Sequence, residues 1–403
     1  MKILKNITVF TMVMLLSVST VLEAREKNIS NFSSSASNLV DSTGTFDGNK
    51  IYADVANNGL FLDYHVSGDS ALEWPKGTGV HSIFQSALWM GATVNGSIRT
   101  IVGDYTQDMG PGPWGGDPLA AVHRIYKVEK SMLASPLDFA DFQEWPVEFG
   151  APWVDVDGDG VYTPLPGGTD HPEFLGDQVL WFVSNDGDPA YKLNFGTSPM
   201  NVEIQTTMFG FDRPDVFGDM VFLKQLVINK GSDDLVDTYM GLWSDPDLGY
   251  AGDDFVGCDV ALGMGYVWND GDDSQYSTLD IGTPAAGYDF FQGPMVPCED
   301  GDSEEVCPAE GAKMFGTRHP GMKNLKMSSF AFYINGDATY TDPSDETEGY
   351  FYLQGLRKDG SAYPAEIAGD LYDQRFCFYG DPNDAAGHST ANPVDGNLSL
   401  IHI

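Results

Sequence analysis

The chain has 403 residues and a formal net charge of −38, because 59 aspartates and glutamates outnumber 21 lysines and arginines. This balance argues against binding to nucleic acid or to anionic lipid, both of which require a basic surface. Forty-six glycines, 23 prolines and an aromatic content of 12% are typical of a protein built from many strands and turns.

The first 24 residues have the pattern of a secretory signal peptide. Lys2 and Lys5 precede the uncharged apolar run Ile7–Leu22, and Ala24 supplies a small residue for cleavage. A membrane anchor is the alternative, but this run is shorter than the roughly 20 residues of a spanning helix. We therefore expect a secreted or cell-surface protein, with no transmembrane segment after cleavage and a flexible linker over residues 25–45.

Residues 46–150 are expected to form an N-terminal β-rich region. Asn95-Gly96 separates two apolar runs and predicts a tight hairpin, whereas Asp104–Gly116 is rich in glycine and proline and predicts a long loop. Core packing is the default expectation for tryptophan. Trp114 lies within this loop, so it is the tryptophan that we single out for contact with a ligand.

Residues 151–397 are expected to form a β-sandwich region with acidic, calcium-type loops. Convincing helix patterns are almost absent from the chain, which argues against α/β folds. We expect an all-β fold, an antiparallel, jelly-roll-like β-sandwich, either one large sandwich or two packed together. The predicted strands are Ser82–Val94, Ala121–Val128, Val179–Ser184, Val202–Phe211, Met220–Asn229, Val236–Trp243, Val260–Val267, Ser328–Ile334 and Tyr350–Leu356.

The stretch Val154–Tyr162 reads V-D-V-D-G-D-G-V-Y and alternates three aspartates before a glycine. Carboxylates this close repel one another unless a cation lies between them, and oxygen-rich loops with glycine suit calcium. The loop is not an EF-hand, because its position 12 is Pro166 and no helix pattern flanks it. The expected calcium ligands are Asp155, Asp157, Asp159 and the Val161 carbonyl, closed by Asp170, Glu173 or Asp177.

A second acidic cluster, W-S-D-P-D-L-G-Y-A-G-D-D-F-V-G-C-D, follows a predicted strand. Pro246 and Gly249 favour turns that could bring its carboxylates to one ion. For both clusters a solvated acidic loop is the alternative. The expected ligands here are Asp245, Asp247, Asp253, Asp254 and Asp259.

Four cysteines in an exported chain suggest disulfides. Cys298 and Cys307 bracket a short acidic loop and are predicted to pair, while a bond between Cys258 and Cys377 follows only by elimination.

Several long motifs in a fixed order cover most of the chain between Asn57 and Pro382. They are E-W-P-K-G at Glu73–Gly77, A-L-W-M-G at Ala87–Gly91, E-W-P-V at Glu144–Val147, G-A-P-W-V-D-V-D-G-D-G-V-Y at Gly150–Tyr162, G-D-Q-V-L-W-F-V at Gly176–Val183, L-W-S-D-P-D-L-G at Leu242–Gly249, D-D-F-V-G-C-D at Asp253–Asp259, G-Y-D-F-F-Q-G-P at Gly287–Pro294 and F-Y-L-Q-G-L-R-K-D-G at Phe351–Gly360. Through these motifs the chain resembles a family of large exported bacterial β-rich proteins, mostly of unassigned function, that usually end in a type IX secretion sorting domain. The resemblance implies a further sandwich portion and a sorting domain downstream, and it brings no catalytic residues.

The last six residues, Leu398–Ile403, match what one reading frame of a common transposase-end sequencing adapter encodes. We therefore expect residues 398–403 to be a non-native read-through tail on a truncated chain.

Motifs of hydrolases are missing, including H-E-x-x-H and G-x-S-x-G. We expect a non-enzymatic, calcium-stabilised β-sandwich protein with a structural or adhesive role, whose partners are surface glycans or other extracellular proteins. The alternative is a secreted polysaccharide-active hydrolase or its carbohydrate-binding module.

Overall fold

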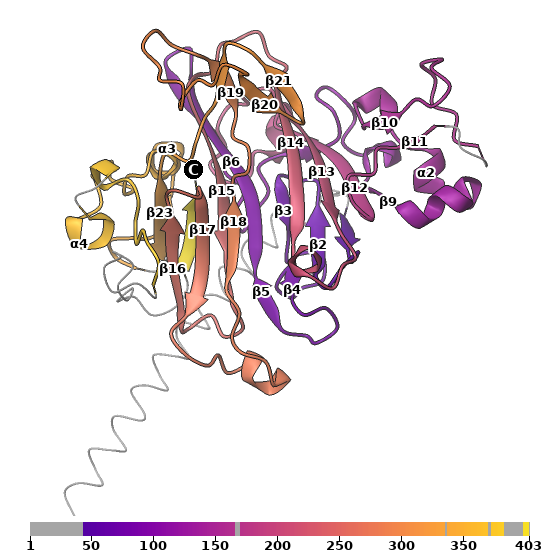
Figure 1. Cartoon of the computed structure of the whole chain (residues 1–403). Coiled ribbons are helices and arrows are strands. Elements are labelled where there is room, and N and C mark those ends of the chain that lie inside the picture. Colours follow the sequence, from indigo (N-terminus) through magenta and orange to yellow (C-terminus); the bar gives the residue numbers. More distant parts are fainter. Residues whose placement is uncertain (1–42, 166–169, 335–336, 370–371, 383–397, 403) are drawn as a thin grey trace, which may run out of the picture. The chain divides into compact units, whose positions relative to one another are not determined.

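A computed structural model describes residues 43–165, 170–334, 337–369, 372–382 and 398–402 of the chain. The predicted signal peptide and all but the last three residues of the predicted linker lie outside this part. The described residues form mostly strands, and every pairing between the named strands is antiparallel (Figure 1). The predicted all-β, sandwich-like fold is therefore confirmed.

One sheet, which we call the β6 sheet, has six strands in the order β23-β24-β15-β6-β3, with β7 also paired to β6. Asn95 and Gly96 both have positive φ angles, 52° and 81°, and join β6 to β7 as the predicted hairpin. The strands of this sheet are β3 (Leu60–Leu62), β6 (Gln85–Val94), β7 (Ser97–Ile101), β15 (Val236–Asp245), β23 (Phe330–Ile334) and β24 (Leu398–His402).

A second sheet, the β12 sheet, has five strands in the order β14-β13-β12-β8, with β9 also paired to β12. Its strands are β8 (Gly110–Pro111), β9 (Tyr126–Glu129), β12 (Gln178–Asn185), β13 (Val202–Gly210) and β14 (Val221–Asn229). Both sheets combine strands from residues 46–150 with strands from residues 151–397, so the two predicted regions share one fold.

Smaller sheets complete the strand structure of the described residues. They are the four-stranded sheet of β1 (Thr43–Phe46), β2 (Tyr52–Ala56), β4 (Leu72–Glu73) and β5 (His81–Ile83), the three-stranded sheet of β16 (Asp254–Asp259), β17 (Met264–Asn269) and β18 (Ala286–Asp289), and the pairs β10 (Trp153–Val154) with β11 (His171–Pro172), β19 (Met295–Pro297) with β22 (Met322–Asn324), and β20 (Ala312–Met314) with β21 (Thr317–His319).

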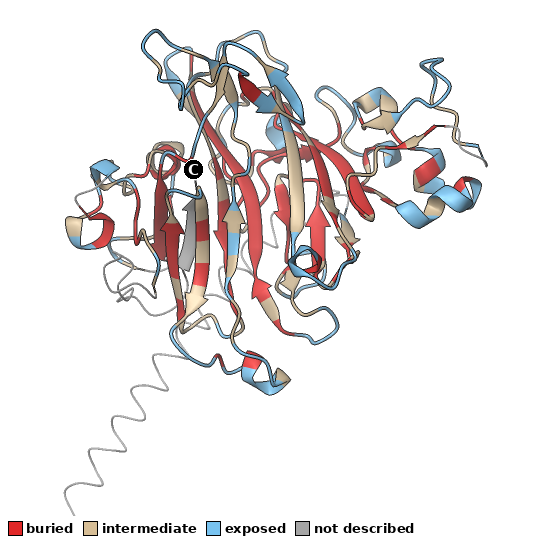
Figure 2. Ribbon diagram, viewed as in Figure 1, coloured by how far each residue is buried: buried red, intermediate tan, exposed pale blue. Residues whose placement is uncertain are grey.

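Alternation along β6 explains why the β6 sheet has two buried faces (Figure 2). Successive side chains of a strand point to opposite faces. Leu88 and Met90 pack in a cluster with Val202 and Ile204 of β13, so this face meets the β12 sheet. The opposite face carries Trp89, which belongs to a separate cluster that includes residues of β23, α3 and the three-stranded sheet of β16, β17 and β18.

The β12 sheet is buried on both faces in the same way. Leu180 and Phe182 join a cluster with strands β1 and β2, whereas Val179 and Trp181 join a cluster with the segment that contains α2.

The helical elements are α2 (Ala140–Gln143), α3 (Glu346–Leu353) and α4 (Ala365–Ala368), with short 3-10 turns η1 (Ala121–His123), η2 (Lys130–Ala134), η3 (Pro136–Asp138), η4 (Val147–Phe149), η5 (Pro189–Tyr191), η6 (Val216–Asp219), η7 (Tyr276–Leu279) and η8 (Tyr372–Gln374).

The prediction of a strand over Tyr350–Leu356 is wrong, because Tyr350–Leu353 form the end of helix α3 and a turn follows it. The Asp345 carboxylate accepts hydrogen bonds from the amides of Thr347 and Glu348, both at 2.9 Å, and so caps the helix. The D-x-x-E pattern from Asp345 to Glu348 is the signal that could have identified it.

Two other predicted strands begin four or more residues later in the structure. The first part of Ala121–Val128 is the 3-10 turn η1. Strand β17 begins only at Met264, because Asp259 accepts a hydrogen bond from the Leu262 amide at 3.0 Å and holds a turn.

Leu398–His402 forms β24, paired with β15 and β23. Its predicted non-native origin stays a prediction. None of the helices in the described part of the chain is long and apolar enough to cross a membrane.

Candidate metal centre

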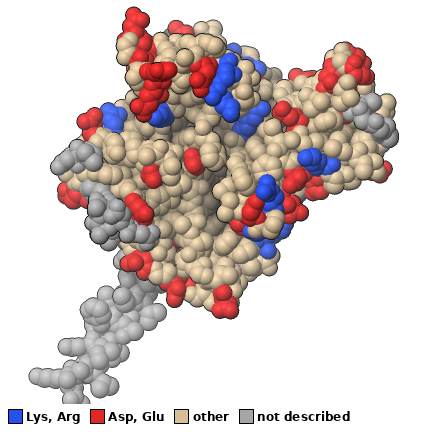
Figure 3. Space-filling view, viewed as in Figure 1, with Lys and Arg blue, Asp and Glu red and all other residues tan. Residues whose placement is uncertain are grey.

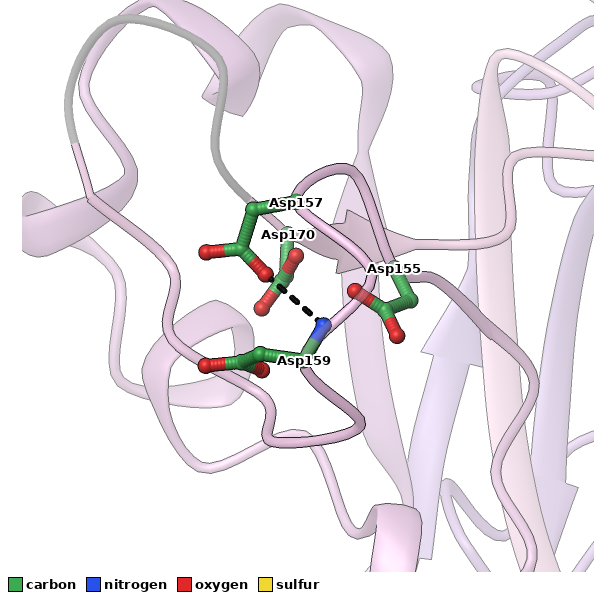
Figure 4. A group of neighbouring side chains, drawn as sticks. All are labelled: Asp155, Asp157, Asp159 and Asp170. Carbon is green, nitrogen blue, oxygen red and sulfur yellow. Dashed lines mark hydrogen bonds between the residues drawn. The ribbon is translucent and has the colours of Figure 1, made fainter.

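Four aspartates come together in the loop between β10 and β11 (Figure 4). Asp155, Asp157, Asp159 and Asp170 each offer a carboxylate oxygen, and these oxygens all lie within 4.8 Å of one another. The pairing of Val154 with His171 explains the arrangement, because it places the two ends of the loop side by side. Of the three closing carboxylates considered from the sequence, the structure brings Asp170 into the group.

Backbone amides organise the exposed side of this cluster. The Asp155 carboxylate accepts hydrogen bonds from the amides of Gly158 at 2.6 Å and Gly160 at 2.9 Å. Both glycines have positive φ angles, 77° and 75°, a conformation that residues with a Cβ rarely adopt. The glycines of the D-G-D-G motif therefore allow the chain to turn around its own carboxylates.

Asp170 is the buried member of the cluster, with 1% of its surface exposed. Its carboxylate accepts hydrogen bonds from the Val156 amide at 2.9 Å and from the Thr163 amide at 2.8 Å, and the Thr163 hydroxyl lies at 3.2 Å. The amide of Thr163 is the main reason why the pKa of Asp170 is lowered. Asp170 is thus held in its charged form, and Thr163 is a supporting residue that the sequence pattern did not identify.

Asp157 has the opposite electrostatic setting. The hydrogen bond from the Asp159 amide acts to lower its pKa, but partial desolvation and the charges of Asp159, Asp170 and Asp155 together raise it. The cluster therefore penalises the charge on Asp157 when no cation is bound. An ionised carboxylate has about four acceptor positions, so the amide bonds leave oxygen lone pairs free for an ion.

The donor set fits calcium by its chemistry. Four hard carboxylate oxygens agree with the preference of calcium for six to eight oxygen ligands in a flexible arrangement. The Val161 amide donates to the Asp159 carboxylate at 2.8 Å, so Val161 adjoins the cluster, and ligation by its carbonyl stays a prediction.

Asp177 and Glu173 lie outside this group. The Asp177 carboxylate accepts the Asp212 amide at 3.0 Å, and Glu173 lies 3.7 Å from the Lys224 ammonium. Lys224 lies in β14 and Asp212 follows β13, so both residues have partners in or directly after strands of the β12 sheet.

The carboxylates of the second acidic cluster do not come together at one point. Among the described residues, the four-aspartate loop is the one place where three or more potential ligand side chains lie close enough to share an ion. Asp254 and Asp259 are the first and last residues of β16. Five steps along a strand span about 16 Å, so these two carboxylates are at its opposite ends.

The remaining members have separate partners. Asp245 accepts a hydrogen bond from the Tyr105 hydroxyl at 2.9 Å, and Asp253 accepts one from the side-chain amide of Asn269 at 2.7 Å. Asp254 is buried and accepts the Leu248 amide at 2.9 Å, and burial raises its pKa to about 8. Asp247 is also buried, and its charge raises the pKa of Asp254 further.

Trp114 lies shortly after β8 and has 43% of its surface exposed. Its backbone amide donates to the Glu203 carboxylate at 2.9 Å, and its indole nitrogen donates to the Asn201 side chain at 3.2 Å. The indole ring is therefore fixed by a hydrogen bond at its nitrogen and remains partly accessible to solvent. Four other tryptophans, Trp89, Trp145, Trp181 and Trp243, are buried as expected for core residues.

Cys298 and Cys307 form the predicted disulfide, with their Cα atoms 5.9 Å apart. Cys258 and Cys377 are free thiols, so the bond inferred by elimination is not formed in this structure. The Cys258 thiol donates to the Cys377 carbonyl at 3.4 Å, and burial raises the pKa of both thiols well above the usual value.

The surface agrees with the acidic composition. Figure 3 shows acidic side chains on several parts of the viewed face, among fewer lysines and arginines. No protein-family model matches this chain, and no curated protein or solved structure matches it. The resemblance to exported bacterial proteins of the type IX secretion class therefore stays a prediction.

Proposed function

We propose that the protein is an exported, calcium-stabilised β-sandwich protein with a structural or adhesive role at or outside the cell surface. The observation that supports the calcium part is the convergence of Asp155, Asp157, Asp159 and Asp170 within 4.8 Å. Sites of extracellular modules typically have dissociation constants of about 0.1–1 mM, so they are filled at extracellular calcium levels and act as structural staples.

The loop that holds this cluster connects to the folded core through a few aromatic contacts. Tyr162 donates its hydroxyl to the Phe142 carbonyl at 2.6 Å and packs edge-on against Trp153 with ring centroids 5.6 Å apart. A bound ion would join both ends of the loop and keep these contacts together. We therefore assign calcium a role in stability rather than in chemistry.

The test compares thermal unfolding of the wild type, Asp157→Asn and Asp272→Asn, each with excess calcium and with a chelator. Asp272 is an exposed aspartate outside the cluster and provides the matched control for lost charge. Calcium should raise the transition temperature of the wild type and of Asp272→Asn equally, and should raise that of Asp157→Asn much less.

The chelated samples provide a second sign to check. Because its neighbours raise the pKa of Asp157, removing this charge should stabilise the calcium-free protein. Asp157→Asn should thus be more stable than the wild type without calcium and less stable with it. A wild-type transition that does not respond to calcium would remove the calcium part of the proposal.

The alternative class, a glycan-binding or polysaccharide-cleaving protein, is favoured by the exposure of Trp114. Aromatic rings with an exposed face are suited to stacking on sugars. A glycan array and a reducing-sugar assay on the full chain separate the two classes. Glycan binding that is lost in Trp114→Ala would support a glycan-binding module. Release of reducing sugar would show that the protein is a hydrolase and would overturn the proposed structural role.

A further inference from the structure

Away from the calcium loop, one lysine is buried together with two aspartates. Lys192 follows η5, Asp108 precedes β8, and Asp186 follows β12. The exposed fractions of the three side chains are 1%, 2% and 0%, respectively. Long charged side chains are rarely buried so completely unless they are paired.

The distances distinguish the two carboxylates. The Lys192 Nζ lies 2.7 Å from Oδ2 of Asp108 and 4.0 Å from Oδ2 of Asp186, and it also donates to the Thr100 carbonyl at 2.6 Å. The amine is therefore in contact with one carboxyl group and within reach of a second.

Hydrogen bonding gives the two carboxylates different roles. Asp186 accepts the amides of Met200 and Val202, each at 2.7 Å, so both of its oxygens are held. Asp108 accepts the Val102 amide through Oδ2 at 2.9 Å, whereas its buried Oδ1 has no hydrogen-bond partner among the described residues. A buried carboxylate oxygen without a hydrogen-bond partner destabilises the folded protein if the ion pair is all that forms. In a condensation between Lys192 and Asp108, this oxygen could be the one that leaves.

The surroundings favour the uncharged form of Asp108. Met109 and Met200 belong to the buried apolar cluster between the two sheets, and burial raises the pKa of Asp108 to about 6. A desolvated lysine amine is a nucleophile when it loses its proton, and a fixed contact raises its effective concentration by orders of magnitude.

We propose that Lys192 and Asp108 form an intramolecular isopeptide bond, with Asp186 as the acid–base residue. The Lys192 ammonium first gives a proton to the Asp108 carboxylate, which leaves a neutral amine and a neutral acid. The Nζ lone pair then attacks Cγ of Asp108 and forms the N–C bond. Asp186 takes the second proton from the nitrogen and returns it to the leaving oxygen, the C–O bond breaks, and one water is released.

This reaction needs no oxidant, metal or cofactor, and it removes one positive and one negative charge from the core. The link would join the loop after β7 to the segment after η5 and would close a covalent ring across the β6 and β12 sheets. It is independent of calcium and goes beyond the proposed structural role.

The experiment is an intact-mass measurement on the purified full-length protein, reduced and denatured, beside Lys192→Arg. The measured mass of the wild type should be one water below the mass calculated from its sequence. The measured mass of Lys192→Arg should equal its calculated mass. Because Asp-Gly steps such as Asp157-Gly158 also lose water to form succinimides, a proteolytic digest must show a branched peptide that joins residue 108 to residue 192.

Lys192→Arg keeps the charge and every Asp-Gly step, so its digest should contain the two peptides unlinked. Asp186→Asn should likewise contain mainly unlinked peptides, and full linkage in this variant would overturn the role of Asp186. Wild-type protein with the full mass and two separate peptides would overturn the proposal and leave an ordinary buried ion pair. The branched peptide of the wild type does not depend on whether the variants fold, and circular dichroism of Asp186→Asn checks that this variant is folded before its digest is interpreted.

Discussion

Trp89 and Trp243 stack nearly parallel in the core, with ring centroids 5.7 Å apart and an interplanar angle of 8°. They come from the neighbouring strands β6 and β15, and both are fully buried. The indole nitrogen of Trp243 donates to the Tyr333 hydroxyl of β23 at 2.7 Å. This side-chain hydrogen bond therefore links β15 and β23 within the aromatic cluster.

The first prediction concerns this contact. Tyr333→Phe leaves the buried indole N–H of Trp243 without its partner and should lower the free energy of unfolding by about 1–3 kcal/mol. Trp243→Phe should also destabilise. The double variant should lose less than the sum, because the interaction is then absent from both sides. Urea unfolding measures all three, and additive losses would show that the hydrogen bond contributes nothing.

The second prediction concerns the packing of α3 on β6 at Gly91. A Cβ at this position would lie 2.6 Å from Cδ2 of Tyr350 and 2.9 Å from Cδ1 of Leu353. The hydroxyl of Tyr350 is held by the Asp237 carbonyl, so the ring has little freedom to move. Gly91→Ala should cost about 1–3 kcal/mol of stability.

The control for this substitution is Gly282→Ala, since a Cβ at Gly282 meets no atom within 4 Å. That variant should be neutral or slightly more stable than the wild type in the same thermal melt. Equal effects of the two substitutions would contradict the packing of α3 against β6.

The third prediction is a pH dependence from Asp104. Burial, reinforced by the charge of Asp342, outweighs the hydrogen bond from Asn194 and raises the pKa of Asp104 from 3.8 to about 7. The folded state thus binds this proton more tightly than the unfolded state. The contribution of Asp104 to stability is present below about pH 4 and is lost as the pH rises through about 7.

Asp104→Asn cannot titrate, so its free energy of unfolding should fall less than that of the wild type between about pH 4 and pH 8. Denaturant unfolding at a series of pH values measures the difference. The control variant Asp272→Asn, at an exposed position, should show the same pH dependence of the free energy of unfolding as the wild type. Parallel profiles for Asp104→Asn and the wild type would show that Asp104 titrates normally.

The fourth prediction concerns the disulfide between Cys298 and Cys307. Closing a loop of about 10 residues stabilises by about 2.7 kcal/mol on the chain-entropy relation. The double Cys→Ser variant should lose about this amount and should no longer respond to reductant. Reductant should lower the free energy of unfolding of the wild type by the same amount, which is measured by unfolding it with and without reductant.

The longer strands of the two central sheets, such as β6, β12 and β13, could be predicted from the sequence because they carry β-branched and aromatic residues bounded by turn residues. The short strands β3, β8 and β24 carry no such pattern and were not predicted. The segment around Tyr350 has the same aromatic content, and this propensity outweighed the weaker capping signal from Asp345 to Glu348. Tertiary packing on β6 decides the outcome there, and packing cannot be read from local composition.

The four-aspartate cluster was partly predictable for a related reason. Asp155, Asp157 and Asp159 are close in sequence, so any compact loop brings them together. Asp170 required the register of β10 with β11, which is set by two short strands and has no strong sequence pattern. The triad of Lys192, Asp108 and Asp186 was not identified, because its members come from three separate segments and carry no motif.

The position of β6 also has a consequence for how the chain reaches its native state. Ser86 of β6 and Ser244 of β15 have hydroxyls 3.1 Å apart but are separated by 158 positions in the chain. Pairings at such separation must overcome a large loop-closure entropy, and proteins dominated by them fold in milliseconds to seconds. During synthesis, the edge of β6 that pairs with β15 stays exposed until β15 has been made. A chain of this design would benefit from remaining unfolded, or bound to a chaperone, until its synthesis has passed that strand.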